Sequence, residues 1–421
     1  MPFSIKFFNN FFKKDYLQFC AIILLCLLPI LLFIGTGILN LGIIILDLIF
    51  ILEIISKKRL FFLKNNIFYS LMLLWLSLLI NVFFSIDPVN SFNRGFGFIR
   101  FVFFVMLLIY FLNLDNQKFK NLILSCWSII FLITSVDLLF EFITGRNLLG
   151  FESYIGGRLA GFFNDELIIG HFYYGFILIT IFCILQIIAK KKQKYNFSNW
   201  IYVFIFVFLV VSFLIGERSN FIKVLIMILC FSFLFEKKFF KQKILLFSVF
   251  FLVAVLFINL NSYFKDRFIT QIFKPILNNP SLYFNNLNYF QHYRTAIKIY
   301  DNNKIFGVGL KNYRLEVSKK VYHDLHTSTH PHQVHFEFLS ELGIIGYFFL
   351  ITFFSYHLYN FKKNNSYNDN LNLAGLLFVI TSLLPILPSG SFFTSNGATL
   401  FWMNFAIMIL NQKKISYDFF K

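Results

Sequence analysis

Charged side chains are scarce in this chain and make up only 14% of its 421 residues. About a quarter of the residues in a soluble domain are charged, so this composition excludes an ordinary water-soluble core. Hydrophobic residues make up 58% of the chain, and the mean hydropathy is +0.71. They come in blocks of roughly 17–25 residues, the length that a helix needs to cross a bilayer. The sequence therefore predicts an all-α, polytopic integral membrane protein.

Cysteine is also rare. The five cysteines lie inside apolar blocks, without the spacing of a disulfide framework or a zinc site, and we expect them to be small buried hydrophobes. The first apolar block is a full span without a small-residue cleavage site, so we expect no cleaved signal peptide. The chain shows no internal repeat and no inverted pair of broken helices, which disfavours a transporter.

Acidic residues are outnumbered, since 38 Lys and Arg face 20 Asp and Glu and give a net charge of +18. Such a charge would suit nucleic acid if it were gathered in one stripe. Here the lysines are scattered at the ends of apolar blocks, as the positive-inside rule predicts. We therefore expect membrane lipids, and no nucleic acid, as partners.

The apolar blocks predict about twelve membrane helices, with a large loop, residues 261–335, between helices 9 and 10. This loop separates the membrane helices of residues 1–260 from those of residues 336–421. Helical apolar spacing at 289–301 predicts that the loop folds as a small cap. The expected spans are residues 17–35, 37–56, 66–84, 94–113, 119–143, 166–189, 198–215, 219–236, 243–260, 336–359, 371–388 and 396–411.

Lysine distinguishes two sets of loops. One set of short loops carries it, for example at Lys57, Lys190 and Lys362, whereas alternate loops such as residues 85–88 and 389–391 have none. By the positive-inside rule, the lysine-bearing loops and both termini are cytoplasmic. The alternate loops then face outward, including the two long ones, residues 144–165 and 261–335.

Arginine is nearly absent from the lysine-bearing loops, because only Arg59 of the nine arginines lies there. Arginine presents a fixed fork of donors that fits phosphate or carboxylate, whereas lysine is a hydrated point charge. The asymmetry predicts an anionic ligand on the outer face. Pairing with a nearby acid or a lipid headgroup explains any single arginine equally well; the acids are Asp87, Glu152, Asp165 and Asp266. The outward arginines are Arg94, Arg100, Arg146, Arg158, Arg218, Arg267, Arg294 and Arg314.

Three of these arginines are better placed than the rest, and Arg100 is a secondary candidate. Arg218 lies in a turn of a few residues between two predicted spans, which holds it at the membrane edge. Arg158 lies among glycines that permit a close approach of the backbone to a ligand. Arg294 opens a run that ends in Phe306-Gly-Val-Gly309. Arg100 lies about two turns inside its span, where a charge is costly unless it faces the interior of the bundle.

Histidines crowd the segment before the tenth predicted span. A zinc site is one interpretation, but the spacing is loose and no cysteine completes it. A histidine that acts as a base or a hydrogen-bond donor fits better, because its ordinary pKa is near neutrality. Most of the five would then only cap the helix and solvate the loop. Glu337 and Glu341 share a helix face and either orient a histidine or face water. The histidines are His323, His326, His330, His332 and His335.

The stretch His332-Gln-Val-His-Phe-Glu-Phe-Leu-Ser-Glu341-Leu-Gly343-Ile-Ile-Gly346 resembles the His-Asn-x-x-Leu…Glu-x-Gly-x-x-Gly signature of the O-antigen ligase and polymerase superfamily. Gln333 stands where the family usually has Asn, and Phe336 where it has Leu. The resemblance covers most of the chain from about residue 150 onward. Further pieces that resemble the family are Gly216-Glu-Arg-Ser219, Arg158 with Gly161-Phe-Phe-Asn164, Arg294…Phe306-Gly-Val-Gly309 and Ser389-Gly-Ser-Phe-Phe-Thr…Phe401-Trp402.

The resemblance implies an inverting, metal-independent membrane glycosyltransferase without a cofactor. Such an enzyme moves a glycan from an undecaprenyl-diphosphate carrier to an acceptor hydroxyl on the periplasmic face of the bacterial inner membrane. His332 would activate the acceptor. Arg218 and Arg294 would bind the diphosphate, with Arg158 assisting. The remaining candidate binding residues are Arg100, His335, Glu341 and Gln333.

Three functions remain open at this point. A ligase would join the glycan to lipid A–core, and the compact histidine motif favours it. A polymerase of the same superfamily would join it to another lipid-linked repeat unit. A transporter for lipid-linked glycans would need charged residues through several spans, but such candidates are few (Asp47, Asp137 and Glu141).

Overall fold

The computed structural model describes residues 15–114, 118–152, 157–163, 168–191, 200–235, 240–322 and 328–410. Every regular element in these ranges is a helix, which confirms the all-α prediction. Helices follow the apolar blocks because a segment in lipid must satisfy its backbone N–H and C=O groups internally. The candidate residues Asn164, Asp165, His323 and His326 lie outside the described residues.

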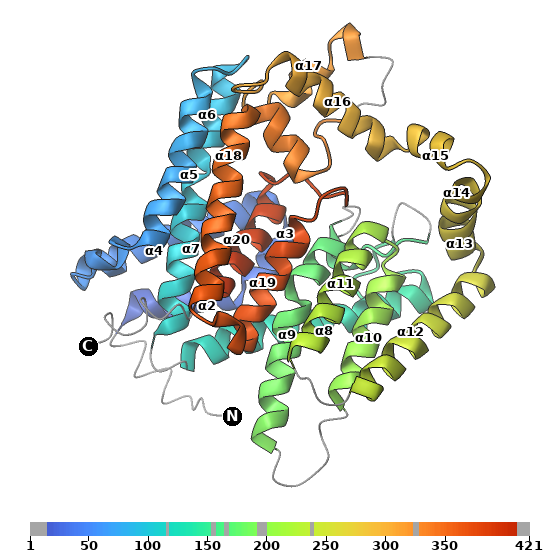
Figure 1. Ribbon diagram of the computed structural model, residues 1–421. Coiled ribbons are helices and arrows are strands. Elements are labelled where there is room, and N and C mark those ends of the chain that lie inside the picture. Colours follow the sequence, from blue (N-terminus) through green and yellow to red (C-terminus); the bar gives the residue numbers. More distant parts are fainter. Residues whose placement is uncertain are drawn as a thin grey trace.

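The first group of helices surrounds α7 (Ile99–Asn113), whose side chains are almost all buried. α6 (Pro88–Gly97) continues α7 toward one end of the molecule, and α4 (Thr36–Ser56) and α5 (Asn66–Val82) pack beside it (Figure 1). α2 (Tyr16–Cys26) and α3 (Leu28–Ile34) form a pair bent by 56°.

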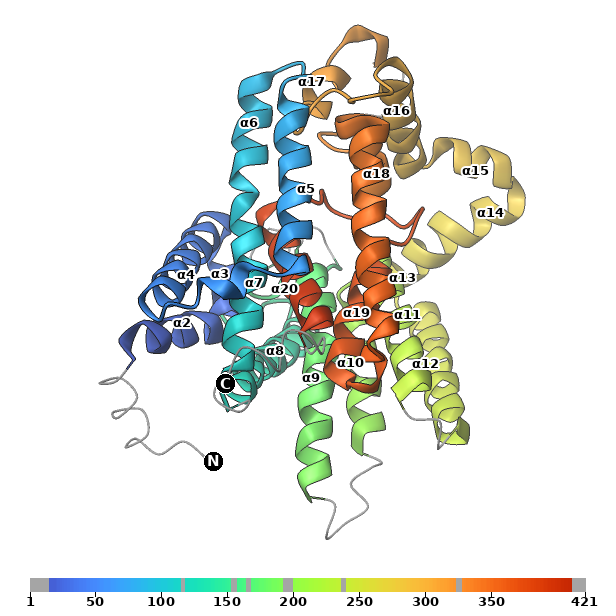
Figure 2. The same ribbon diagram turned by 60° about the vertical axis from the view of Figure 1, so that its left-hand side comes forward.

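The centre of the molecule is α20 (Ser395–Ile409), which is buried along most of its length. It packs against α7, α19 (Asn370–Ser382) and α9 (Ile169–Lys191). α12 (Phe240–Leu260), by contrast, lies at the periphery of the molecule (Figure 2). Only 22% of its most apolar stretch is buried. The remaining long helices are α8 (Lys118–Thr144), α10 (Trp200–Leu214), α11 (Arg218–Phe235), α12 (Phe240–Leu260) and α18 (Val334–Lys363).

The number of spans differs from the prediction of about twelve. In the described part of the chain, six helices are long and apolar enough to cross a membrane, or up to seven if the bent α2–α3 pair is one span. α5, α10 and α19 occupy predicted spans, but are shorter apolar helices of 10–17 residues. Helical membrane architecture is therefore supported and the twelve-span count is not.

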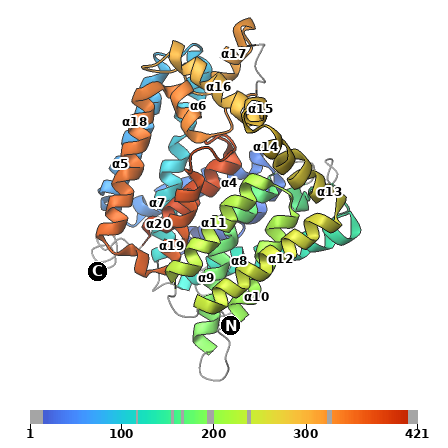
Figure 3. The same cartoon turned by 45° about the vertical axis from the view of Figure 1, so that its right-hand side comes forward.

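The segment after α12 forms an arm of short helices that runs along one side and over the end of α18 (Figure 3). The helix expected at 289–301 is present as α16, which packs against α18. The elements of the arm are α13 (Ser262–Lys265), the π-helix η5 (Asp266–Phe273), α14 (Lys274–Asn278), α15 (Pro280–Asn286), α16 (Asn288–Asn302), α17 (Tyr313–Val317) and η6 (Lys320–Tyr322).

The arm crosses α18 where that helix is broken at Gly343, which has φ 65° and ψ −168°. Only glycine occupies this region readily. Backbone hydrogen bonds join the two segments, from Val308 N to Ser340 O and from Gly309 N to Glu341 O. A Cβ on Gly307 would lie 2.4 Å from the carbonyl carbon of Glu341, so the crossing requires direct contact of two backbones.

Gly343→Ala is expected to destabilise the fold. A Cβ there would lie 2.3 Å from the carbonyl oxygen of Ile305, and the backbone conformation alone costs on the order of 1–3 kcal/mol for other residues. Thermal unfolding in detergent should show a lower midpoint. Gly37→Ala is the matched control, because its Cβ would meet nothing within 4 Å and alanine favours a helix. Equal midpoints for the two variants would contradict the packing argument.

Candidate active site

The site is organised by the α19–α20 segment, residues 383–393, which has no regular structure of its own across most of its length. Its backbone carbonyls and amides are bound by side chains and backbone groups from α11, α16 and the start of α18, so helices distant in sequence converge on it. These bonds run from His335 Nε2 to Leu383 O, from Gln333 Nε2 to Leu384 O, from Tyr293 Oη to Ile386 O, from Ser219 Oγ and Lys223 Nζ to Pro388 O, and from Ser389 N to His332 O.

His332 lies just before α18 in a left-handed conformation with φ 56°. Its carbonyl accepts the 2.7 Å bond from Ser389 N, and its Nε2 lies 3.0 Å from Ser328 Oγ. The ring packs against His292 of α16, with centroids 5.3 Å apart. A non-glycine residue with positive φ is uncommon and is often found where function demands it.

The rings of His330 and His332 are neutral at physiological pH. Burial lowers the pKa of His332 to about 3, and the neighbouring His330 and His292 lower it further. Burial also lowers the pKa of His330 to about 4, together with the Arg314 charge. A neutral imidazole can accept a proton, and a bound anion beside it would raise its pKa. His332 is therefore a candidate base.

The other motif residues hold the backbone. Gln333 caps α18, since its Oε1 accepts the N–H groups of His335 and Phe336 at 2.7 and 3.1 Å. Both nitrogens of His335 are engaged, Nε2 with Leu383 O at 2.8 Å and Nδ1 with the Tyr347 hydroxyl at 3.2 Å. The oxygen of the Gln333 amide therefore orients the residues at the start of α18 by accepting their N–H groups.

The two glutamates of α18 also bind the protein itself. Glu341 accepts the backbone N–H of Lys311 at 2.9 Å, which fixes the crossing of the arm. Glu337 accepts the backbone N–H of Phe392 at 2.8 Å and the Ser391 hydroxyl. Both carboxylates are buried. They therefore position segments around the site, and neither turns toward water.

Three arginines gather on the other side of the site, and we name Arg158, Arg218 and Arg267 the arginine cluster. Arg218 Nη1 donates to the backbone oxygen of Arg267 at 3.1 Å, which joins α11 to the arm. Arg267 lies over the Tyr263 ring at 5.7 Å. Within the described residues, the buried Nε atoms of Arg158 and Arg267 have no hydrogen-bond partner.

Positive charge is in excess in this cluster. Glu217 is the one described carboxylate that forms an ion pair with it, 3.4 Å from Arg158 Nη2. That carboxylate also accepts from Asn220 Nδ2 and Gly170 N. Burial raises the pKa of Glu217, and the Arg158 charge opposes the rise. Burial lowers the pKa of Arg267, and Arg218 lowers it further. Such a cluster suits a multiply charged anion.

Tyr289 of α16 lies near both His332 and the arginine cluster. Its ring lies 5.6 Å from the His332 ring in an edge-on arrangement, and it is one of the groups around Arg267. The α19–α20 segment gives a connection between them, because Pro388 O bonds Ser219, beside Arg218, while Ser389 N bonds His332 O. A candidate base and a candidate anion site therefore belong to one region.

Two predicted site residues lie elsewhere. Arg294 is exposed on α16. It is two residues from His292, so helix periodicity of 3.6 residues per turn places it on a nearly opposite face from the one that contacts His332. Arg100 lies in α7 beside Arg94. In the described residues no group of three or more His, Cys, Asp or Glu could hold a metal ion.

Arg267, Tyr289 and His292 were not singled out from the sequence. The available signal was that Arg267 is one of the outward arginines, but its neighbour Asp266 suggested a local pair. In the structure Asp266 instead accepts from Gln271 Nε2 at 2.8 Å. The pairing explanation does hold for Arg146, which bonds Glu152 at 2.5 Å.

Comparison with known families places this site in context. A family model described as O-antigen ligase matches residues 203–351. This part of the chain is similar to that family. The superfamily resemblance found in the sequence is thereby confirmed, and the apolar helices support a membrane protein. A search of curated proteins finds no match.

The matched residues include Arg218, Arg267 and His332, whereas Arg158 and the α19–α20 segment lie outside them. The site therefore combines groups from the matched region with groups that pack onto it. α9 and α19 contact α11, and this packing brings the outside groups into place.

Proposed function

We propose that the protein is an O-antigen ligase that transfers a glycan from an undecaprenyl-diphosphate carrier to a hydroxyl of lipid A–core. The proposal is carried by the arginine cluster, which has a single ion-paired carboxylate among the described residues. Tyr289 lies near both this cluster and the neutral ring of His332. One side of the site suits a diphosphate, and the other can take a proton.

The reaction would be an inverting displacement. The acceptor oxygen attacks the anomeric carbon of the glycan, and the bond from that carbon to the diphosphate oxygen breaks. The acceptor proton passes to His332, and the electron pair leaves with the carrier diphosphate. Preorganised guanidinium groups stabilise that charge and can do so without a divalent cation.

The proposed orientation has the site on the periplasmic face of the inner membrane and both termini in the cytoplasm. The support is the distribution of lysine among the predicted loops. In this arrangement the shorter apolar helices α5, α10 and α19 complete the spans. The lipid tail of the donor would stay in the bilayer while its diphosphate reaches the arginine cluster.

The lipopolysaccharide profile of a deletion strain tests this function, with undecaprenyl-linked glycan extracted in parallel. We expect bare core on the gel together with long glycan retained on the carrier. Core that carries a single repeat would instead identify the polymerase, which shares the donor chemistry. An unchanged profile would exclude both, and activity that requires a vesicle gradient would identify a transporter.

The pH dependence of transfer tests the role of His332. Because its pKa is lowered to about 3 in the free protein, its imidazole stays neutral as the pH falls from about 8 to 5, so kcat/KM should show no acid limb from this group. Binding of the diphosphate raises the pKa of His332 in the substrate complex. The acid limb of kcat should therefore lie at a higher pH than the acid limb of kcat/KM. Transfer assays in nanodiscs measure both. A limb in kcat/KM near pH 6.5 would show an ordinary histidine and contradict the argument.

A further inference from the structure

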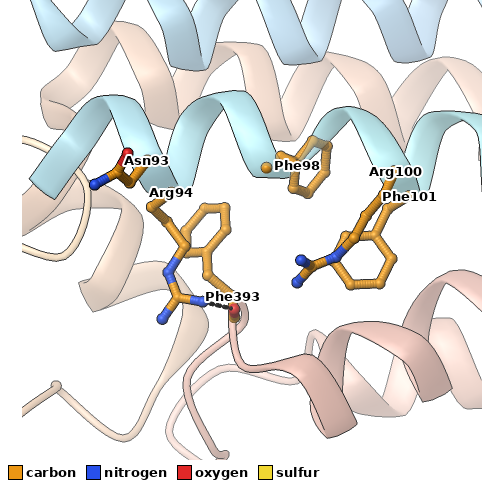
Figure 4. Close-up of a pocket in the computed structure, with 7 residues that line it drawn as sticks. Asn93, Arg94, Phe98, Arg100, Phe101 and Phe393 are labelled. Atoms are coloured by element: carbon orange, nitrogen blue, oxygen red, sulfur yellow. Dashed lines mark hydrogen bonds between the residues drawn. The ribbon is translucent and has the colours of Figure 1, made fainter. Parts of the chain in front are cut away.

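Two further arginines, Arg94 and Arg100, line a separate pocket of about 60 Å³ between α6, α7 and Phe393. Figure 4 shows the guanidinium groups of Arg94 and Arg100 on the same side of the helix, both turned into the space beside Phe393. A water molecule needs roughly 10–15 Å³ of such space, so the pocket can hold a group of several atoms. Gly97, Phe98 and Phe101 supply much of the remaining wall.

The charges in this pocket are incompletely matched. Arg94 Nη1 donates to Phe393 O at 2.5 Å, and the buried Nε of Arg100 has no hydrogen-bond partner in the described chain. Glu337 and Glu341 attract Arg94, and Asp47 attracts Arg100. Among the described residues, none of these three carboxylates forms an ion pair with either arginine. The two arginines also repel each other.

The depth of the pair makes this arrangement costly without a ligand. Pro88–Asn113 is a candidate span of 26 residues. With a rise of about 1.5 Å per residue, Arg100 lies roughly 18 Å from the first residue of that span. Charges inside a membrane span are expensive and often mark a functional site.

We propose that Arg94 and Arg100 form a phosphate-binding site for the phosphorylated headgroup of a membrane amphiphile. Two guanidinium groups provide the fork of donors that phosphate oxygens accept. The pocket lies beside a candidate membrane span, Pro88–Asn113, so a lipid headgroup is the anion closest at hand. The site is separate from the arginine cluster and does not depend on the transfer reaction. Through Arg94, it holds the α20 end of the α19–α20 segment.

Native mass spectrometry of the detergent-purified full chain tests this site. The probes are a short-chain phosphatidylglycerol, the matched uncharged diacylglycerol and inorganic phosphate as competitor. We expect retention of phosphatidylglycerol over diacylglycerol. Arg100→Gln should weaken it by about tenfold, as for loss of a charged hydrogen bond.

Gly97→Leu should weaken it similarly, because Gly97 lines the pocket and a Cβ there meets nothing within 4 Å. This variant keeps both charges and serves if Arg100→Gln does not fold. Arg146→Gln, at the exposed pair with Glu152, is the control and should bind as the wild type does.

Arg100-dependent binding of inorganic phosphate that phosphatidylglycerol does not displace would support the phosphate site and identify free phosphate as its source. Phosphatidylglycerol binding that is the same in the wild type, Arg100→Gln and Gly97→Leu would overturn the proposal. Because the readout is binding, this result is independent of whether glycan transfer occurs.

Discussion

Replacement of His332 by alanine is expected to abolish glycan transfer while the protein remains folded. A positioned general base contributes roughly 10²–10⁴-fold to a rate, and the ring of His332 lies near Tyr289, which is also near the arginine cluster. Loss of the ring leaves its carbonyl bond to Ser389 N in place. The measurement is transfer of a lipid-linked glycan by purified protein in nanodiscs, with bare core accumulating in cells.

Two further variants separate the ring from the backbone. His332→Asn removes the base but tolerates positive φ better than alanine, so its loss of activity cannot be attributed to backbone strain. Thr329→Ala, at an exposed neighbouring position, is the matched control and should retain full activity. Ser328→Ala, which removes the partner of His332 Nε2, should give an intermediate rate. Near-normal product from His332→Asn would remove His332 from the mechanism.

Helical architecture was predictable because long apolar blocks leave the backbone few alternatives in lipid. The lengths of the individual helices could not be predicted in this way. The block at 371–388 is apolar throughout, yet α19 ends at Ser382. Pro385 and Pro388 follow, and proline removes a backbone donor and disfavours helix in the residue before it. Hydropathy measures composition, whereas the end of a helix is set by such local breaks.

The structure brings several motif residues into one region, but their contacts could not be inferred from their chemistry. Glu341, His335 and Gln333 were predicted to bind substrate, and in the structure they bind backbone groups. A buried polar side chain must find a hydrogen-bond partner. The sequence alone does not show whether that partner is a group of the protein or of a ligand. Their recurrence in a family motif is explained equally well by the crossing at Gly343.

The arginines show where sequence reasoning succeeds and fails. Arg218 was placed because a turn of a few residues between two apolar blocks fixes it at a membrane edge. Arg267 was not, because its position depends on the path of a long arm over the helices. That path is set by contacts such as the bond from Arg218 Nη1 to its backbone oxygen, which join residues distant in sequence.

Removal of one guanidinium from the arginine cluster is expected to reduce transfer by about 10²–10³-fold, the usual cost of losing one preorganised donor to developing charge. Arg218→Lys and Arg267→Lys test this most sharply. Each keeps a positive charge but loses the fork of donors that matches phosphate oxygens, so activity should fall although the net charge is unchanged. The measurement is kcat with a saturating lipid-linked donor.

Arg267 and Arg294 distinguish the geometry from the sequence motif. The motif predicts that Arg294 binds diphosphate, whereas the structure places it exposed on α16 and places Arg267 beside Arg158 and Arg218. Arg267→Ala should therefore cost more than Arg294→Ala, with Arg146→Ala as the exposed control. The reverse order would mean that α16 turns when the donor binds and that Arg294, not Arg267, meets the leaving diphosphate.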